Sequence, residues 1–186
     1  MTAADPERVV IQGDRPAGDG PRHPVVLVLD RLRSAHNVGN IFRLAEVCRF
    51  EAVVTCGYTA TPPHPKLAKT AMGTETLVPC RHFPDSVAAL TALAAEGYYL
   101  LAVETVAGAP PPWEAPMQWP LALVLGNEAL GIDPAALALC HAATCLPVFG
   151  SKNSLNVGNC SAVACYEAIR RLTADAGLTF PDLASE

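Results

Sequence analysis

The sequence lacks the features that would place a protein in a membrane or direct it out of the cell. No apolar run approaches the ~20 residues that a membrane-spanning helix needs. The N-terminal stretch, MTAADPERVV, lacks the basic-then-apolar order of a signal peptide. These two absences predict a soluble, cytoplasmic protein that does not bind a membrane.

Cysteine pairs with the spacing of a metal site are also absent. None of the seven cysteines belongs to a Cys-x-x-Cys pair, and the five histidines are scattered along the chain. We therefore expect no zinc or other metal site. Most of the cysteines fall within apolar runs, where the role of a small buried hydrophobic residue is expected.

Charged residues are scarce, at 17% of the chain against 51% hydrophobic residues. This composition excludes a disordered chain, and it suggests that some apolar surface is buried against a second subunit. The 186 residues suffice for one domain with a sizeable core. We expect that domain to span 24–176, with a short arm at 1–23 and a tail at 177–186.

The charge is also unevenly distributed. The whole chain carries −5, which argues against nucleic-acid binding. Residues 22–81, however, hold eight Lys or Arg and four Asp or Glu, whereas residues 82–186 hold three and ten. The first half is therefore where a polyanion is expected to bind. Chance clustering of charge on a solvated surface remains the alternative.

Apolar runs alternate with amphipathic segments along the chain. Strands are predicted at 25–30, 52–56, 77–80, 98–104, 121–126 and 144–148. Helices are predicted to begin at 37–40 and after 61–69, to span 84–96 and 133–140, and to follow a polar loop at 150–159. The last helix has an expected apolar face of Ala162, Cys165, Tyr166 and Ile169. This alternation predicts an α/β fold with a mainly parallel sheet flanked by helices.

Three polar, glycine-bearing motifs stand out among the loops. They read NVGNIFR at 37–43, LGNEALGI at 125–132 and LPVFGSKNSLNV at 146–157. In open α/β sheets, ligands bind beyond the carboxyl ends of the strands, which is where these motifs are expected. Each motif alone is compatible with an ordinary turn or a capped helix start. The combination of all three motifs in this order is a much more specific signal than any one of them.

The first motif has a chemical interpretation of its own. Arg43 lies off the apolar stripe of its helix, so its guanidinium is available to a partner. Gly39 allows a backbone to approach closely, and Asn37 either caps the helix or holds the arginine. In the second motif, Glu128 is either a functional carboxylate or a turn residue that caps a helix.

In these motifs the sequence resembles the SpoU/TrmH-type RNA 2′-O-ribose methyltransferases of the SPOUT superfamily. The resemblance extends from Val25 to Arg171 and includes the segment 70–73, TAMG. It implies an S-adenosyl-L-methionine-dependent enzyme that methylates a ribose 2′-hydroxyl in structured RNA, in tRNA before rRNA. It also implies a deep trefoil knot in the C-terminal third and a homodimer with the active site at the interface. The alternative is a knotted RNA-binding or assembly protein without turnover.

The resemblance also implies roles for the residues that match the motifs. The implied catalytic residues are Asn37, Arg43, Glu128, Ser154 and Asn156. The implied cofactor-binding residues are Glu104, Leu125, Gly126, Ile132, Leu146, Leu155 and Asn156. The family assigns activation of the 2′-oxygen to the arginine that matches Arg43. A guanidinium whose pKa exceeds about 12 is a poor proton acceptor, so positioning of the ribose and phosphate is an equal alternative.

The positive half of the chain and the first motif together predict where RNA binds. Arg31 and Arg33 lie in the loop just before the motif, so we expect them to bind RNA together with Arg43. No separate RNA-binding domain is recognisable in the sequence. Substrate choice is therefore expected to depend on the core surface, on the arm at 1–23 or on an accessory protein.

Overall fold

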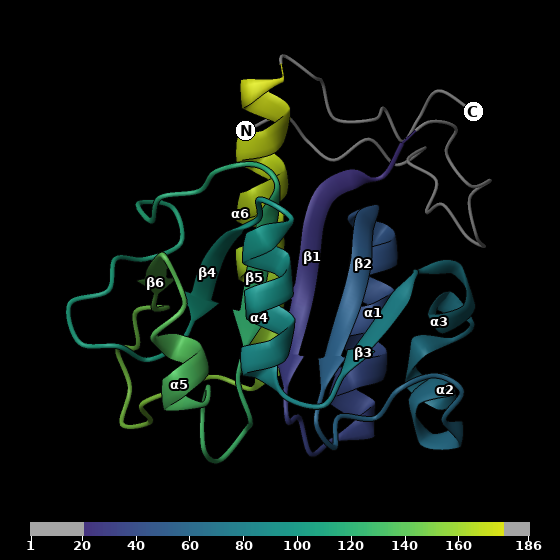
Figure 1. The fold of residues 1–186 in the computed structure, drawn as a ribbon. Coiled ribbons are helices and arrows are strands. Elements are labelled where there is room, and N and C mark those ends of the chain that lie inside the picture. The colour runs from purple at the N-terminus through teal and green to yellow at the C-terminus, as the bar shows by residue number, and fades with distance from the viewer. Residues whose placement is uncertain (1–20, 177–186) are drawn as a thin grey trace, which may run out of the picture.

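One six-stranded parallel sheet forms the centre of the molecule, in a computed structural model that describes residues 21–176. The strand order is β3-β2-β1-β5-β4-β6, and every pairing is parallel. The strands are β1 (His23–Asp30), β2 (Phe50–Cys56), β3 (Cys80–Phe83), β4 (Tyr99–Val103), β5 (Leu121–Leu125) and β6 (Ala142–Thr144). The predicted α/β class is confirmed, and all carboxyl ends of the strands meet at one edge (Figure 1).

Helices cover both faces of this sheet. They are α1 (Ala35–Val47), α2 (Pro65–Ala71), α3 (Thr74–Leu77), α4 (Ser86–Ala95), α5 (Pro134–Leu137) and α6 (Val157–Asp175). Figure 1 shows α4 and α5 on one face and α1 and α6 on the other. Within the described residues, no helix is long and apolar enough to cross a membrane.

Strand β1 lies in the middle of the sheet, and this position explains the uninterrupted apolar run at residues 25–29. Val25, Leu27 and Leu29 pack in the core on the side of α1 and α6. Val26 and Val28 pack in the core on the side of α4 and α5. A parallel strand that is covered on both faces needs hydrophobic side chains at every position.

Helices α1 and α2 approach each other closely at Gly39. A Cβ atom on Gly39 would lie 2.9 Å from the backbone nitrogen of Ala71 and closer still to the Thr70 hydroxyl and the Leu67 carbonyl oxygen. Only glycine tolerates this approach without a shift of α2. The expected close backbone approach at Gly39 is therefore present, and its neighbour is α2.

The predicted boundaries of two strands are wrong. Strand β3 begins at Cys80, because residues 74–77 form α3 and Val78 ends that helix. Strand β6 ends at Thr144 rather than continuing to 148. Thr144 pairs with Val103, the last residue of β4, so the chain beyond it has no neighbouring strand.

The predicted helix starts also need correction. Helix α1 begins at Ala35 with Ser34 as its N-cap, so Asn37 does not cap it. Helix α6 begins at Val157, and its predicted face is only partly confirmed, because Cys165 is buried and Ile169 packs against the core but Tyr166 does not. Its buried stripe includes the small residues Ser161, Ala164 and Ala168, whereas Tyr166 is 55% exposed. The small residues allow α6 to pack closely against α1 and the sheet.

Part of the predicted organisation lies outside the described residues. The tail at 177–186 does so entirely, and the arm at 1–23 does so except for 21–23, of which His23 opens β1. The knotted path of the chain stays a prediction.

Candidate active site

Loops at the carboxyl ends of the strands enclose a cavity of about 690 Å³. The loop after β4, the turn after β5 and the segment between β6 and α6 all contribute to it. Six of the seven predicted cofactor-binding residues line this cavity: Glu104, Gly126, Ile132, Leu146, Leu155 and Asn156. The seventh, Leu125, does not line it. Its side chain is 1% exposed and points into the hydrophobic core, because Leu125 is the last residue of the buried strand β5.

The turn after β5 is built tightly enough to leave room only for glycine at two points. Asn127 and Gly131 exchange backbone hydrogen bonds of 3.1 and 2.9 Å, and Gly131 has a φ of +70°. A Cβ atom on Gly126 would lie 2.9 Å from Ile132 Cγ1 and closer to the backbone of Gly131. Glu104 Oε2 accepts a hydrogen bond of 2.9 Å from the Ile132 N–H, so this carboxylate fixes the turn against β4.

Glu128 joins this turn to the start of α1. Its carboxylate accepts hydrogen bonds from the backbone N–H groups of Arg33 (2.9 Å) and Ser34 (3.1 Å) and from Asn37 Nδ2 (2.9 Å). Partial burial would raise the pKa of Glu128, but these hydrogen bonds outweigh it and hold the pKa below its usual value. The group is therefore an ionised carboxylate at a helix N-terminus, where negative charge is stabilised. Glu128 therefore caps α1, which is far from it in the sequence, and not a helix next to its own turn.

Asn156 extends the same network to the third motif. Its Nδ2 donates to Asn37 Oδ1 at 3.4 Å, and its Oδ1 accepts the Gly158 N–H at 2.9 Å, which caps α6. A Cβ atom on Gly158 would lie 2.8 Å from Asn40 Nδ2, so α6 begins in close contact with α1. The hydrogen bonds among Glu128, Asn37 and Asn156 thus link all three motifs beside the cavity, which Glu128 and Asn156 line.

Arg43 lies outside this network. Within residues 21–176 its guanidinium contacts only the Met72 sulfur, at 3.3 Å from Nη1. The reason is helical geometry, because a residue six positions after Asn37 points about 240° around the helix. Ser154 lines the cavity but is also outside the network, since among the described residues its hydroxyl bonds only to Asn153 Oδ1, at 3.4 Å. Glu128, Ser154 and Asn156 do not contact Arg43 within one chain, and the expectation that they orient it at a dimer interface stays a prediction.

The two arginines before the first motif have different environments. Arg31 pairs with the buried Asp30 (2.9 Å) and with Asp133 (3.3 Å). The hydrogen bond to Asp30 is the main cause that raises the pKa of Arg31. This guanidinium is held by two carboxylates, so the prediction that it binds RNA is not supported. Arg33 is exposed and makes no ion pair with any described residue, so it stays available to an anion.

The comparisons with known proteins agree with this geometry. The model of the SpoU rRNA Methylase family matches residues 24–166. The 23S rRNA (uridine(2479)-2′-O)-methyltransferase of Streptomyces viridochromogenes is 28% identical over 185 residues, which covers 95% of this chain and 64% of that protein. The 23S rRNA (guanosine(2553)-2′-O)-methyltransferase RlmP of Bacillus subtilis is 32% identical over 143 residues, or 76% and 56% of the two chains. This chain spans about three fifths of the length of these curated relatives.

Solved structures share the fold. The SpoU methyltransferase AviRb of Streptomyces viridochromogenes, in complex with AdoMet, is 25% identical, with a TM-score of 0.75 over 86% of this chain and 66% of that chain. The TrmH/SpoU tRNA modifying enzyme of A. aeolicus has a TM-score of 0.76 over 89% and 83%, at 19% identity, and so supports the fold alone. The second and third motifs line one cavity, the first motif is hydrogen-bonded to both, and the family model covers most of the chain. The protein therefore belongs to the SpoU rRNA Methylase family.

Proposed function

We propose that this protein transfers a methyl group from S-adenosyl-L-methionine to a ribose 2′-hydroxyl of structured RNA, with ribosomal RNA as the first candidate. The observation that carries the proposal is the Glu128–Asn37–Asn156 network, which joins the three motifs at the mouth of one cavity. The relatives named above act on 23S rRNA, and the structure of one relative holds AdoMet.

The chemistry of the cavity fits this cofactor. Two carboxylates, Glu104 and Glu128, line the cavity, and no lysine or arginine does among the described residues. Such a lining favours a ligand that carries a positive sulfonium group. The tight turn at Gly126 brings backbone N–H and C=O groups to the cavity, where an adenine edge needs them. Leu146, Leu155 and Ile132 would flank the ligand, which supplies an electrophilic methyl carbon.

The chain's own residues would act by orienting the ribose. Methyl transfer is an in-line displacement, so the geometry of the attacking oxygen accounts for much of the rate. Glu128 and the amides of Asn37 and Asn156 are fixed by one another and present polar groups at the cavity mouth. Arg43 is exposed and contacts no carboxylate among residues 21–176, so its fork of donors can take a phosphate or the 2′-oxygen from the nucleic acid itself.

A transfer assay tests the proposal and separates the RNA classes. Purified protein and methyl-labelled S-adenosyl-L-methionine would be incubated with unmodified 23S rRNA or with unmodified tRNA, and the nucleosides analysed by mass spectrometry. Label in a 2′-O-methylnucleoside of rRNA is the expected result. tRNA is the second candidate, because a protein 27% identical, with a TM-score of 0.73, was solved in work on 2-OH methylation of tRNA. No 2′-O-methylation of either RNA would refute the activity.

Cofactor binding separates this function from the alternative of a non-catalytic RNA-binding protein. Calorimetry with S-adenosyl-L-methionine should show binding to the wild-type protein. RNA binding without any cofactor binding would favour the non-catalytic alternative.

A homodimer is part of the same proposal. Apolar side chains are exposed around the cavity and on α6, among them Phe149 (98% exposed), Leu155, Val163 and Tyr166. Large exposed apolar patches are typical of interaction surfaces, and a second copy of the chain would cover this one. Light scattering is expected to give the mass of a dimer, and a monomer at micromolar concentration would contradict it.

A further inference from the structure

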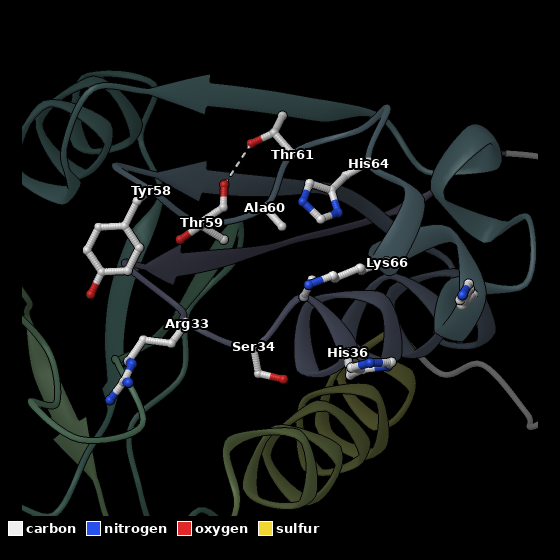
Figure 2. Close-up of a pocket in the computed structure, with 11 residues that line it drawn as sticks. Arg33, Ser34, His36, Tyr58, Thr59, Ala60, Thr61, His64 and Lys66 are labelled. Carbon is white, nitrogen blue, oxygen red and sulfur yellow. Dashed lines mark hydrogen bonds between the residues drawn. The ribbon is translucent and has the colours of Figure 1, made fainter.

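A second cavity, of about 710 Å³, lies beside the first. It opens at the carboxyl ends of β1 and β2, between the start of α1 and the loop that leads into α2. Its lining residues are Arg33, Ser34, Ala35, His36, Tyr58, Thr59, Ala60, Thr61, His64, Lys66 and Lys69. Figure 2 shows Tyr58 and Arg33 on one side of this space and His64 and Lys66 on the other.

The charge of this cavity is opposite to that of the first. Arg33, Lys66 and Lys69 line it, and among residues 21–176 no carboxylate does. None of these three side chains forms an ion pair within the part of the chain that the structure describes. His64 Nδ1 accepts the Leu67 N–H at 3.4 Å, which leaves Nε2 to carry the proton as a further donor. The cavity therefore offers several donors and positive charges to an anion.

An aromatic ring stands at the edge of this basic cavity. Tyr58 is exposed, yet its hydroxyl accepts a hydrogen bond of 2.8 Å from Nδ2 of the buried Asn127. This bond fixes a ring that would otherwise be mobile on the surface. A fixed, exposed ring next to positive charge is a platform on which an unpaired base can stack while its phosphates are neutralised.

The two cavities share one wall. The backbone of Arg33 and Ser34 lines the basic cavity and donates to Glu128, which lines the acidic one. Tyr58 is bonded to Asn127, the neighbour of Glu128 in the same turn. The close packing of α1 and α2 at Gly39 holds α2, which carries Lys66 and Lys69, on the other side of the basic cavity. A strand of RNA that enters the basic cavity would therefore continue to the cofactor cavity.

We propose that the basic cavity binds the unpaired RNA segment next to the methylated nucleotide, with a base on Tyr58 and phosphates on Arg33, Lys66 and Lys69. This inference rests on the proposed function for the identity of the neighbouring cavity. It assigns RNA contacts to the β2–α2 loop and to α2, which replace the contact expected from Arg31.

The test uses a short fluorescein-labelled oligouridylate, with the full-length protein and no cofactor. Anisotropy would be measured for wild type and for a double variant, Lys66→Ala with Lys69→Ala, over a series of salt concentrations. The double variant should bind about 10- to 100-fold more weakly, and its salt slope should fall by about 0.7 per lost phosphate contact. Tyr58→Leu should weaken binding about 10-fold and Tyr58→Phe much less, because the ring is kept.

Matched controls distinguish the cavity from the overall charge. A double variant, Arg81→Gln with Arg170→Gln, also removes two positive charges, but from exposed sites elsewhere on the molecule. There Arg81 pairs with Glu96, and Arg170 pairs with Glu167. This control variant should bind the oligouridylate like wild type. Calorimetry with S-adenosyl-L-methionine should give unchanged cofactor affinity for all the variants and so report that they are folded.

Each outcome decides between the two proposals. Three results would show that the basic cavity is not an RNA site. The Lys66/Lys69 variant could bind RNA like wild type, both double variants could lose affinity equally, or wild type could fail to bind the oligouridylate. Methylation by wild type would then leave the proposed function standing. If wild type binds no S-adenosyl-L-methionine but the Lys66/Lys69 variant alone loses RNA affinity, the function fails and the RNA site remains.

Discussion

Replacement of Glu128 is the most direct test of how the site is held together. The carboxylate accepts two backbone N–H groups at the start of α1 and one amide donor from Asn37. Glu128→Ala removes all three hydrogen bonds together with the charge. Glu128→Gln keeps the shape and one acceptor oxygen, but it places an NH₂ group among donors.

The size of the effect follows from these contacts. A hydrogen bond to a charged group contributes roughly 1.5–3 kcal/mol, and an anion at a helix N-terminus about 0.3–1 kcal/mol. Glu128 is exposed, so water screens the charge and can replace the lost partners. We therefore expect Glu128→Ala to lower the free energy of unfolding by about 1–2 kcal/mol, and Glu128→Gln by about 1 kcal/mol.

The stabilisation by Glu128 is expected to depend on pH. The folded-state pKa of Glu128 lies below its ordinary value of 4.5, because the hydrogen bonds outweigh the effect of burial. Its contribution to stability is therefore fully present above that ordinary value and is lost as the pH falls through the folded-state pKa. The stability difference between wild type and Glu128→Gln should be constant near neutral pH and shrink under acidic conditions.

Urea unfolding at a series of pH values measures this difference, and methyl transfer by the same variants measures its consequence. Displacement of the α1 start from the cofactor cavity should lower turnover of Glu128→Ala by about 10²-fold. A difference between wild type and Glu128→Gln that does not change with pH would refute the proposed hydrogen bonding. Full activity of Glu128→Ala would show that the link between the motifs does not matter for catalysis.

Three further substitutions test separate parts of the site. Arg43→Ala should leave cofactor affinity unchanged by calorimetry but lower methyl transfer by roughly 10²-fold or more, and wild-type activity would remove Arg43 from the mechanism. Asn156→Ala should weaken both cofactor binding and turnover, and loss of the α6 cap should lower stability by about 1 kcal/mol in urea unfolding; unchanged stability would contradict the capping role. Arg31→Gln should lower stability by about 3 kcal/mol, because it leaves the buried Asp30 without its cationic partner, while RNA affinity of the folded variant stays close to that of wild type. A stable Arg31→Gln protein with weakened RNA binding would restore the original assignment of Arg31.

The fold class and the order of the motifs could be predicted from the amino-acid pattern alone. Uninterrupted apolar runs such as 25–30 and 121–126 report burial on both faces, which a parallel sheet covered by helices requires. Because the carboxyl ends of parallel strands meet at one edge, the motifs after these strands were expected to lie together. Six of the seven residues expected to hold a cofactor do line one cavity between β4, β5 and α6, and their role there stays a prediction.

The ends of elements depended on neighbours that the local pattern does not contain. The run at 144–148 is apolar enough for a strand, but β4 ends at Val103, and only Thr144 finds a partner there. The apolar spacing in α6 suggested a face that includes Tyr166. The buried face includes Cys165 of that pattern but is otherwise formed mainly by small residues such as Ser161, Ala164 and Ala168, where α6 packs against α1 and the sheet.

Which polar and charged side chains meet depends on the tertiary fold. Glu128 lies 91 residues from Asn37 in the chain, and Asp133 is even more remote from Arg31, yet each pair is in direct contact. Residue spacing carries no information about such contacts, because they depend on how separate loops are brought to one edge of the sheet. The same folding gathers Lys66, Lys69 and Tyr58 beside Arg33, and it separates a basic cavity from an acidic one within a chain of net negative charge.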